Sequence, residues 1–98
     1  MRTEKKFSAV EIQALKKADQ DCYLHPTSSL WVLQKKGAKI IARGKGCKVW
    51  DVEGKEYYDG TAALWYSSVG HCRSDLIQAA KEQLDQLESY HSFNEFAN

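Results

Sequence analysis

The chain has 98 residues and a formal net charge of +1; 43% of its residues are hydrophobic and 28% are charged. This composition predicts one folded domain and excludes a disordered tail. A nearly neutral chain lacks the strong field that attracts nucleic acid or an acidic membrane, and no run of about 18 apolar residues predicts a membrane span. The three cysteines are an odd number at wide spacings, which argues against a disulfide framework and favours a cytoplasmic location.

The first predicted element is a helix over residues 8–22. Ser8 followed by Glu11 fits a capping box, in which each side chain satisfies the backbone N–H of the other residue. Apolar residues then recur at spacings of three and four, as a helix that lies on a surface requires: Ala9, Ile12, Leu15, Ala18 and Cys22. Pro26 biases His25 away from helical geometry, so the helix is expected to end before this point.

A three-stranded antiparallel meander is predicted over residues 38–59. Gly44 and Gly46 form a tight turn, and Gly54 marks a hairpin because glycine adopts the positive φ that such turns need. The strands are expected at 39–43, 47–52 and 55–59. The short apolar run 30–33, which precedes the meander, is assigned no regular element.

Residues 61–72 form a segment of small and aromatic residues with too little charge for an ordinary surface loop. Large rings are costly to leave in water, so another surface is expected to cover them. Trp65 and Tyr66 are adjacent, and packing in the core of a strand would bury only one of them well. Core packing and a pocket wall for a small molecule are equally compatible with these residues.

The second predicted helix spans residues 74–88, with Ser74 as its N-cap. Its apolar stripe consists of Leu76, Ile77, Ala80, Leu84 and Leu87. The tail, residues 89–98, carries three aromatic residues where chain ends are usually polar, which indicates a truncated chain. The fold class is therefore α+β: a helix, an antiparallel meander and a second helix.

Other groups of reactive residues are weak candidates. The histidines and cysteines lack zinc-ligand spacing, so no metal site is predicted. The carboxylates around the hairpin are interpreted as solvated turn charges, so no catalytic residue is predicted. Basic residues interleaved with aromatic ones on the sheet leave an alternative open: a small stand-alone binding module for a protein or single-stranded nucleic acid. The near-neutral charge argues against nucleic acid.

The segment from Gly46 to Leu87 resembles the N-terminal part of class III aminotransferases, which are pyridoxal-phosphate (PLP) enzymes of fold type I. The subgroup it resembles most is the ω-amino acid:pyruvate transaminases. The matching motifs, in chain order, are Trp50-Asp51, Gly54, Tyr58-Asp59-Gly60, Leu64-Trp65, Gly70-His71 and Ala79 to Gln83. His25-Pro26 upstream and Tyr90 with Phe93 downstream extend the resemblance over about residues 20–98.

This resemblance implies roles for three substrate-binding residues. Trp65 matches a tryptophan that lines the amine pocket, and Leu64 lies at the edge of that pocket. Phe93 matches an aromatic residue that reaches the active site of the neighbouring subunit in a homodimer. The implied fold is a piece of the small domain, and the implied reaction transfers an amino group from an amine or ω-amino acid to a keto acid such as pyruvate.

The sequence departs from the family pattern at Thr27, Ala63, Tyr66 and Ser68, and these departures concern substrate preference. Family members run to several hundred residues. The resemblance places the phosphate loop, the aspartate that pairs the pyridine nitrogen and the Schiff-base lysine beyond the matched segment. We therefore expect an N-terminal fragment that neither holds PLP nor catalyses transamination alone.

Overall fold

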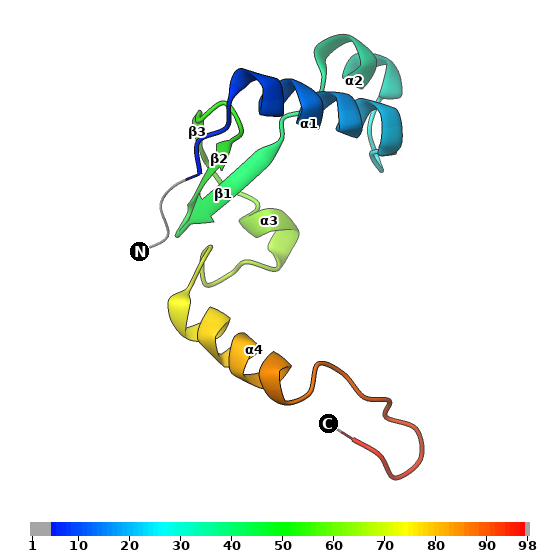
Figure 1. Cartoon of the computed structure of the whole chain (residues 1–98), viewed down its shortest axis with the longest axis vertical. Helices are drawn as coiled ribbons and strands as arrows, with labels where there is room; N and C mark the ends of the chain where they lie inside the picture. Colours follow the sequence, from blue (N-terminus) through cyan, green and yellow to red (C-terminus); the bar gives the residue numbers. More distant parts are fainter. Residues whose placement is uncertain (1–4, 98) are drawn as a thin grey trace.

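The structure, a computed structural model, describes residues 5–97, so residue 98 of the predicted tail lies outside it. Its elements in chain order are α1 (Ala9–Cys22), α2 (Leu30–Lys36), β1 (Ile41–Lys45), β2 (Lys48–Asp51), β3 (Glu56–Tyr58), α3 (Ala62–Trp65) and α4 (Ser74–Gln86). Helices α1 and α2 lie at one end, the sheet and α3 follow, and α4 leads to the C-terminal segment at the other end (Figure 1). The predicted α+β class is confirmed.

The capping box at the start of α1 is present. The Ser8 backbone N–H donates to Glu11 Oε2 at 2.8 Å, and the Glu11 N–H donates to Ser8 Oγ at 3.3 Å. Because these contacts satisfy two backbone donors that a helix start leaves free, the chain enters the helix at Ala9. Tyr23 adopts an extended conformation and ends it.

Helix α2 was not predicted, because its four consecutive apolar residues do not show helical periodicity. The Lys35 ammonium lies 3.7 Å from the centre of the Trp31 ring one turn earlier. Gly37 has a φ of 70° and donates its N–H to Leu33 O at 2.7 Å, which ends the helix. The missed signals were Ser29 before the apolar run and Gly37 after two lysines.

The three strands form a sheet in the order β1-β2-β3, and both pairs are antiparallel. In the register of the ladder, Arg43 pairs with Trp50, and Trp50 pairs with Glu56. Val52, just after β2, is 5% exposed and is the one buried hydrophobic side chain among residues 5–97. The sheet therefore holds what little core the described chain has.

Helix α4 differs slightly from its prediction. Its N-cap is Arg73, and Ser74 is the first helical residue, so the expected Ser74 cap is wrong. The Arg73 guanidinium pairs with Asp75 and lowers the pKa of that carboxyl. The helix contains no buried residue, so its apolar stripe faces outward over its whole length. No helix in the described part of the chain is long and apolar enough to cross a membrane.

Candidate functional site

The segment after β3 folds into α3, a short turn with left-handed backbone. The φ angles are 49° for Ala62, 52° for Ala63, 77° for Leu64 and 74° for Trp65. Each non-glycine residue in this region costs about 1–2 kcal/mol. The N–H groups of Leu64 and Trp65 both donate to Thr61 O, at 3.0 and 2.8 Å. A strained turn of this kind persists only where surrounding contacts hold it in place.

Asp59 supplies such contacts from the start of the segment. Its Oδ2 accepts the Ala63 N–H at 2.8 Å and lies 2.6 Å from His71 Nε2. Its Oδ1 accepts the Thr61 N–H at 3.2 Å and the Thr61 hydroxyl at 3.1 Å. The hydrogen bond to His71, followed by those to Ala63 and Thr61, outweighs burial and lowers the pKa of Asp59. Asp59 is therefore a carboxylate acceptor at neutral pH.

His71 fixes the other end of the segment against the sheet. Its backbone N–H donates to Gly46 O at 2.8 Å, and the Gly46 N–H donates to His71 O at 3.1 Å. A Cβ at Gly44 would lie 2.8 Å from His71 Cγ, so glycine there admits the imidazole ring. The predicted turn at Gly44 to Gly46 is wrong in part, because Gly44 and Lys45 pair with Val49 and Lys48 as the end of β1, and the chain reverses only after them. Nothing local in the sequence indicated that His71 packs on this stretch.

The three predicted substrate residues occupy two separate places. Leu64 and Trp65 project from α3, and the Trp65 side chain is 84% exposed. Phe93 is exposed in the segment after α4, where its ring stacks on His91 with centroids 5.5 Å apart. Helix α4 is about 20 Å long and stands between these two places (Figure 1). Within this chain, Phe93 is not brought to Trp65.

Asp51, one of the hairpin carboxylates, is buried, so its interpretation as a solvated turn charge is wrong. Its Oδ1 accepts the N–H groups of Glu53 at 3.0 Å and Lys55 at 2.9 Å, and its Oδ2 accepts the Tyr57 hydroxyl at 2.8 Å. Burial raises the pKa of Asp51, but these hydrogen bonds together lower it below its ordinary value. All the interactions of this buried carboxylate hold the hairpin.

The rings on the sheet already contact cations of the same chain. The Arg43 guanidinium lies 4.0 Å from the Trp50 ring centre, and Lys48 Nζ lies 5.1 Å from that of Tyr58. A base that stacked on the same face of either ring would displace the cation there. The alternative of a nucleic-acid module stays a prediction, which retention on an oligonucleotide column that falls with rising salt would support.

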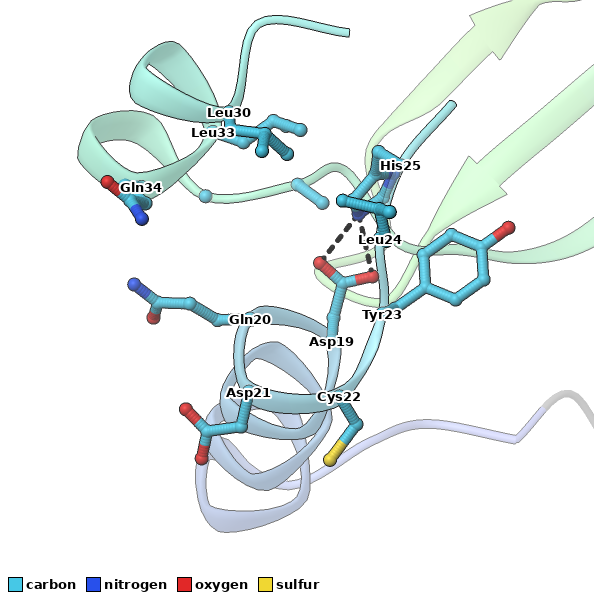
Figure 2. Close-up of a pocket in the computed structure, with 12 residues that line it drawn as sticks. Asp19, Gln20, Asp21, Cys22, Tyr23, Leu24, His25, Leu30, Leu33 and Gln34 are labelled. Carbon is cyan, nitrogen blue, oxygen red and sulfur yellow. Dashed lines mark hydrogen bonds and ion pairs between the residues drawn. The ribbon is translucent and has the colours of Figure 1, made fainter. Parts of the chain in front are cut away.

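A hollow of about 320 Å³ lies between the end of α1, α2 and the connecting loop (Figure 2). His25 Nε2 lies 3.0 and 3.1 Å from the two carboxylate oxygens of Asp19, and the Tyr23 ring meets His25 edge-on. Sequence reasoning did not anticipate this hollow. No group of three potential metal ligands occurs within residues 5–97.

Comparison with known proteins identifies the class. The family model for aminotransferase class-III matches residues 32–98. The putrescine–pyruvate aminotransferase of Pseudomonas aeruginosa is 39% identical over 88 residues, which cover 90% of this chain and 19% of that protein. The chain belongs to the class III aminotransferases, and it spans about a fifth of the length of this relative.

Similar solved structures point to the same family. An (S)-enantioselective ω-transaminase from Thermomicrobium roseum is 38% identical with a TM-score of 0.77, over 86% of this chain and 18% of that one. The ω-transaminase from Pseudomonas jessenii in complex with PMP is 36% identical with a TM-score of 0.81, over 86% and 18%. The predicted family is confirmed, and the fold is that of a segment of a fold type I enzyme.

Class III membership implies PLP in the full-length enzymes. A PLP site needs an enclosed lysine amine, a charge partner for the ring and a cradle for the phosphate. Several lysines of the described chain instead form surface ion pairs, such as Lys16 with Glu53 and Lys48 with Glu56, or lie over aromatic rings. The residues described here do not fit PLP, so no chemical step is assigned to them.

Proposed function

We propose that this chain is the pocket-wall segment of a cytoplasmic, homodimeric, PLP-dependent aminotransferase that moves an amino group from an amine or ω-amino acid to a keto acid such as pyruvate. The observation that carries this proposal is the placement of Leu64 and Trp65. Their side chains project outward from a turn whose backbone is hydrogen-bonded to Thr61 and Asp59. A rigid, apolar wall of this kind limits the size of an amine and excludes water from it.

The exposure of Trp65 supports a surface outside this chain that completes the pocket. An indole ring that is 84% exposed forfeits most of the free energy its burial would give. Tyr66, next to it, is also exposed. We infer that the remaining part of the enzyme encloses one side of this wall and the amine substrate contacts the other.

Engineered relatives support the choice of Trp65 and Phe93. One thermostable ω-transaminase variant, engineered for the synthesis of bulky amines, has substitutions at a tryptophan and at a phenylalanine 28 residues further along. Trp65 and Phe93 are also 28 residues apart in this chain. A second variant made for the same purpose replaces that tryptophan with glycine. The matching separation favours equivalent positions and hence a size-limiting role for both rings.

The separation of Phe93 from Trp65 supports a site built from two subunits. Because α4 stands between the two rings in one chain, we propose that Phe93 serves the pocket of the partner copy. In this arrangement each amine pocket receives Trp65 from one subunit and Phe93 from the other.

The experiment measures the activity of a chimera in which this chain replaces the matched segment of the Pseudomonas aeruginosa putrescine–pyruvate aminotransferase. We expect transamination of pyruvate by the chimera. Trp65→Ala should then raise the ratio of kcat/KM for 1-phenylethylamine to that for putrescine about tenfold or more, because the pocket widens. The affinity for PLP, measured by titration of the apoenzyme, should stay unchanged.

Trp31→Ala is the matched control, because Trp31 is also an exposed tryptophan, at 65%, but lies in α2. It should leave the ratio unchanged. An inactive chimera would count against the proposed function of this segment in transamination. If Trp65→Ala weakened the affinity for PLP as much as it changed the amine ratio, that result would count against the pocket-wall role.

A further inference from the structure

The segment that carries Trp65 is fastened at both ends by one pair of side chains. Asp59 precedes α3 and His71 follows it, 12 residues apart, and their facing atoms lie 2.6 Å from each other. The two side chains are only 10% and 20% exposed. We propose that this pair is a latch that positions the Trp65 ring, so that Asp59 and His71 set amine selectivity without touching the amine. The inference rests on the proposed function of Trp65.

The first support is that the latch reaches the strained backbone directly. The same Asp59 oxygen that faces His71 accepts the N–H of Ala63, inside the left-handed turn. The other oxygen holds Thr61, whose carbonyl accepts the N–H of Trp65. A movement of the Asp59 carboxylate is therefore passed to the Trp65 backbone through two hydrogen bonds.

The second support is that His71 itself has little freedom. Its backbone N–H and C=O both form hydrogen bonds with Gly46, and its ring occupies the space that a side chain at Gly44 would need. Ser67 Oγ lies 3.5 Å from Nδ1, on the other side of the ring from Asp59. The imidazole is thus held in a fixed position on the sheet, and Asp59 connects α3 to it.

The third support is that the latch atoms point inward. Asp59 uses both oxygens for contacts within residues 59–71, and neither residue of the pair projects outward as Trp65 does. Asp59 and His71 are therefore positioning residues, and removing them should displace the indole and leave the chemical steps intact. A displacement of about 1 Å at a substrate contact is enough to change rates by about a hundredfold.

The test uses the chimera and its ratio of kcat/KM for 1-phenylethylamine to that for putrescine. This ratio, measured on one preparation, does not depend on the fraction of enzyme that is folded. We expect His71→Ala to change it about tenfold. His71→Gln places an amide N–H near the position of Nε2 and should restore the ratio to within about twofold. If the His71→Ala chimera does not fold, Asp59→Asn tests the same contact from the other residue of the pair.

Two comparisons sharpen the test. In a Trp65→Ala background, His71→Ala should change the ratio no further, because its effect passes through the indole. His25→Ala removes the other histidine–aspartate pair, with Asp19, and should not change the ratio. The latch alone would be overturned if His71→Ala had its full effect on the ratio in the Trp65→Ala background. It would also be overturned if neither His71→Ala nor Asp59→Asn changed the ratio. An inactive wild-type chimera would overturn the proposed function and the latch with it.

Discussion

At the scale of single residues, two aspartates organise the described chain. Asp51 holds the β2–β3 hairpin, and Asp59 holds α3. In both, the carboxylate accepts backbone N–H groups together with side-chain donors: Tyr57 for Asp51, and His71 and the Thr61 hydroxyl for Asp59. Hydrogen bonds to a carboxylate are stronger than neutral ones, so each aspartate fixes a backbone conformation that its neighbours alone would not hold.

We predict that Asp51→Ala lowers the free energy of unfolding of the chimera by about 1–3 kcal/mol at pH 7, because three donors lose their acceptor. The pKa of Asp51 is lower in the folded chain than in the unfolded one. Its contribution is therefore complete above the unfolded pKa of about 3.9 and is lost as pH falls through the folded pKa. The difference between wild type and variant should shrink in that acidic range.

Urea titrations at pH 7 and at a series of acidic pH values measure this difference. Glu56→Ala is the control, because the Glu56 side chain forms an exposed ion pair with Lys48 and its loss should change stability by less than about 0.5 kcal/mol. A wild-type advantage that grows as the pH falls would contradict the role given to Asp51.

The resemblance named Leu64 and Trp65 from the sequence, but no pattern indicated that Asp59 and His71 meet. Contacts between residues 12 positions apart depend on the path of the chain between them. That path is a left-handed turn without a single glycine among Ala62–Trp65, which intrinsic preferences disfavour. The hydrogen bonds of Asp59 override those preferences, and they exist only in the folded structure.

At the scale of elements, α1 and the meander were predictable because their signals are local: a capping box, β-branched residues and a glycine hairpin. Helix α2 was missed because an apolar run of four residues fits a strand as well as a short helix. The cap of α4 was placed one residue late, at Ser74 instead of Arg73. Residue type alone locates a helix end only to within one or two residues.

We predict that Gly70→Ala loosens the attachment of α3 to the sheet. Gly70 has a φ of 87°, and a Cβ there would lie 3.2 Å from Gly46 Cα. The left-handed conformation alone costs alanine about 1–2 kcal/mol, and the backbone contact adds to that cost. We expect a lower urea midpoint of the chimera and a changed amine ratio.

Gly60→Ala is the matched control. Gly60 borders the same segment, but it does not have a left-handed φ and an added Cβ would meet nothing within 4 Å. This variant should keep both the urea midpoint and the amine ratio. Equal effects of the two substitutions would show that the close approach of Gly70 to Gly46 is unimportant.

At the scale of the whole molecule, the described chain is extended. Its radius of gyration is 17.6 Å, whereas a compact domain of this length has about 13 Å. The outward apolar residues of α4 and the rings of Trp65, Tyr66 and Phe93 are exposed. In the proposed enzyme, parts outside this chain would cover this apolar surface and supply the burial that the described chain lacks.

We predict that the isolated 98-residue chain unfolds with weak cooperativity, because little apolar area becomes newly exposed. Its urea m-value should be well below that of a compact domain of equal length, for which about 1 kcal/mol/M or more is usual. The same preparation should show no PLP absorbance band and no lysine adduct trapped by borohydride. A steep transition would show that the chain forms a core of its own.

The bridge between Gly46 and His71 has a consequence for the order of folding. The hairpins of the sheet pair residues close in sequence. This bridge closes a loop of roughly 25 residues, so its formation costs more conformational entropy. During synthesis the sheet can therefore form while the chain beyond it is still emerging, and we expect α3 to take its shape after His71 has docked. Substitutions in the hairpins should then slow folding, whereas those at Asp59 or His71 should speed unfolding. The turn that carries Leu64 and Trp65 would then form after the sheet and be lost before it.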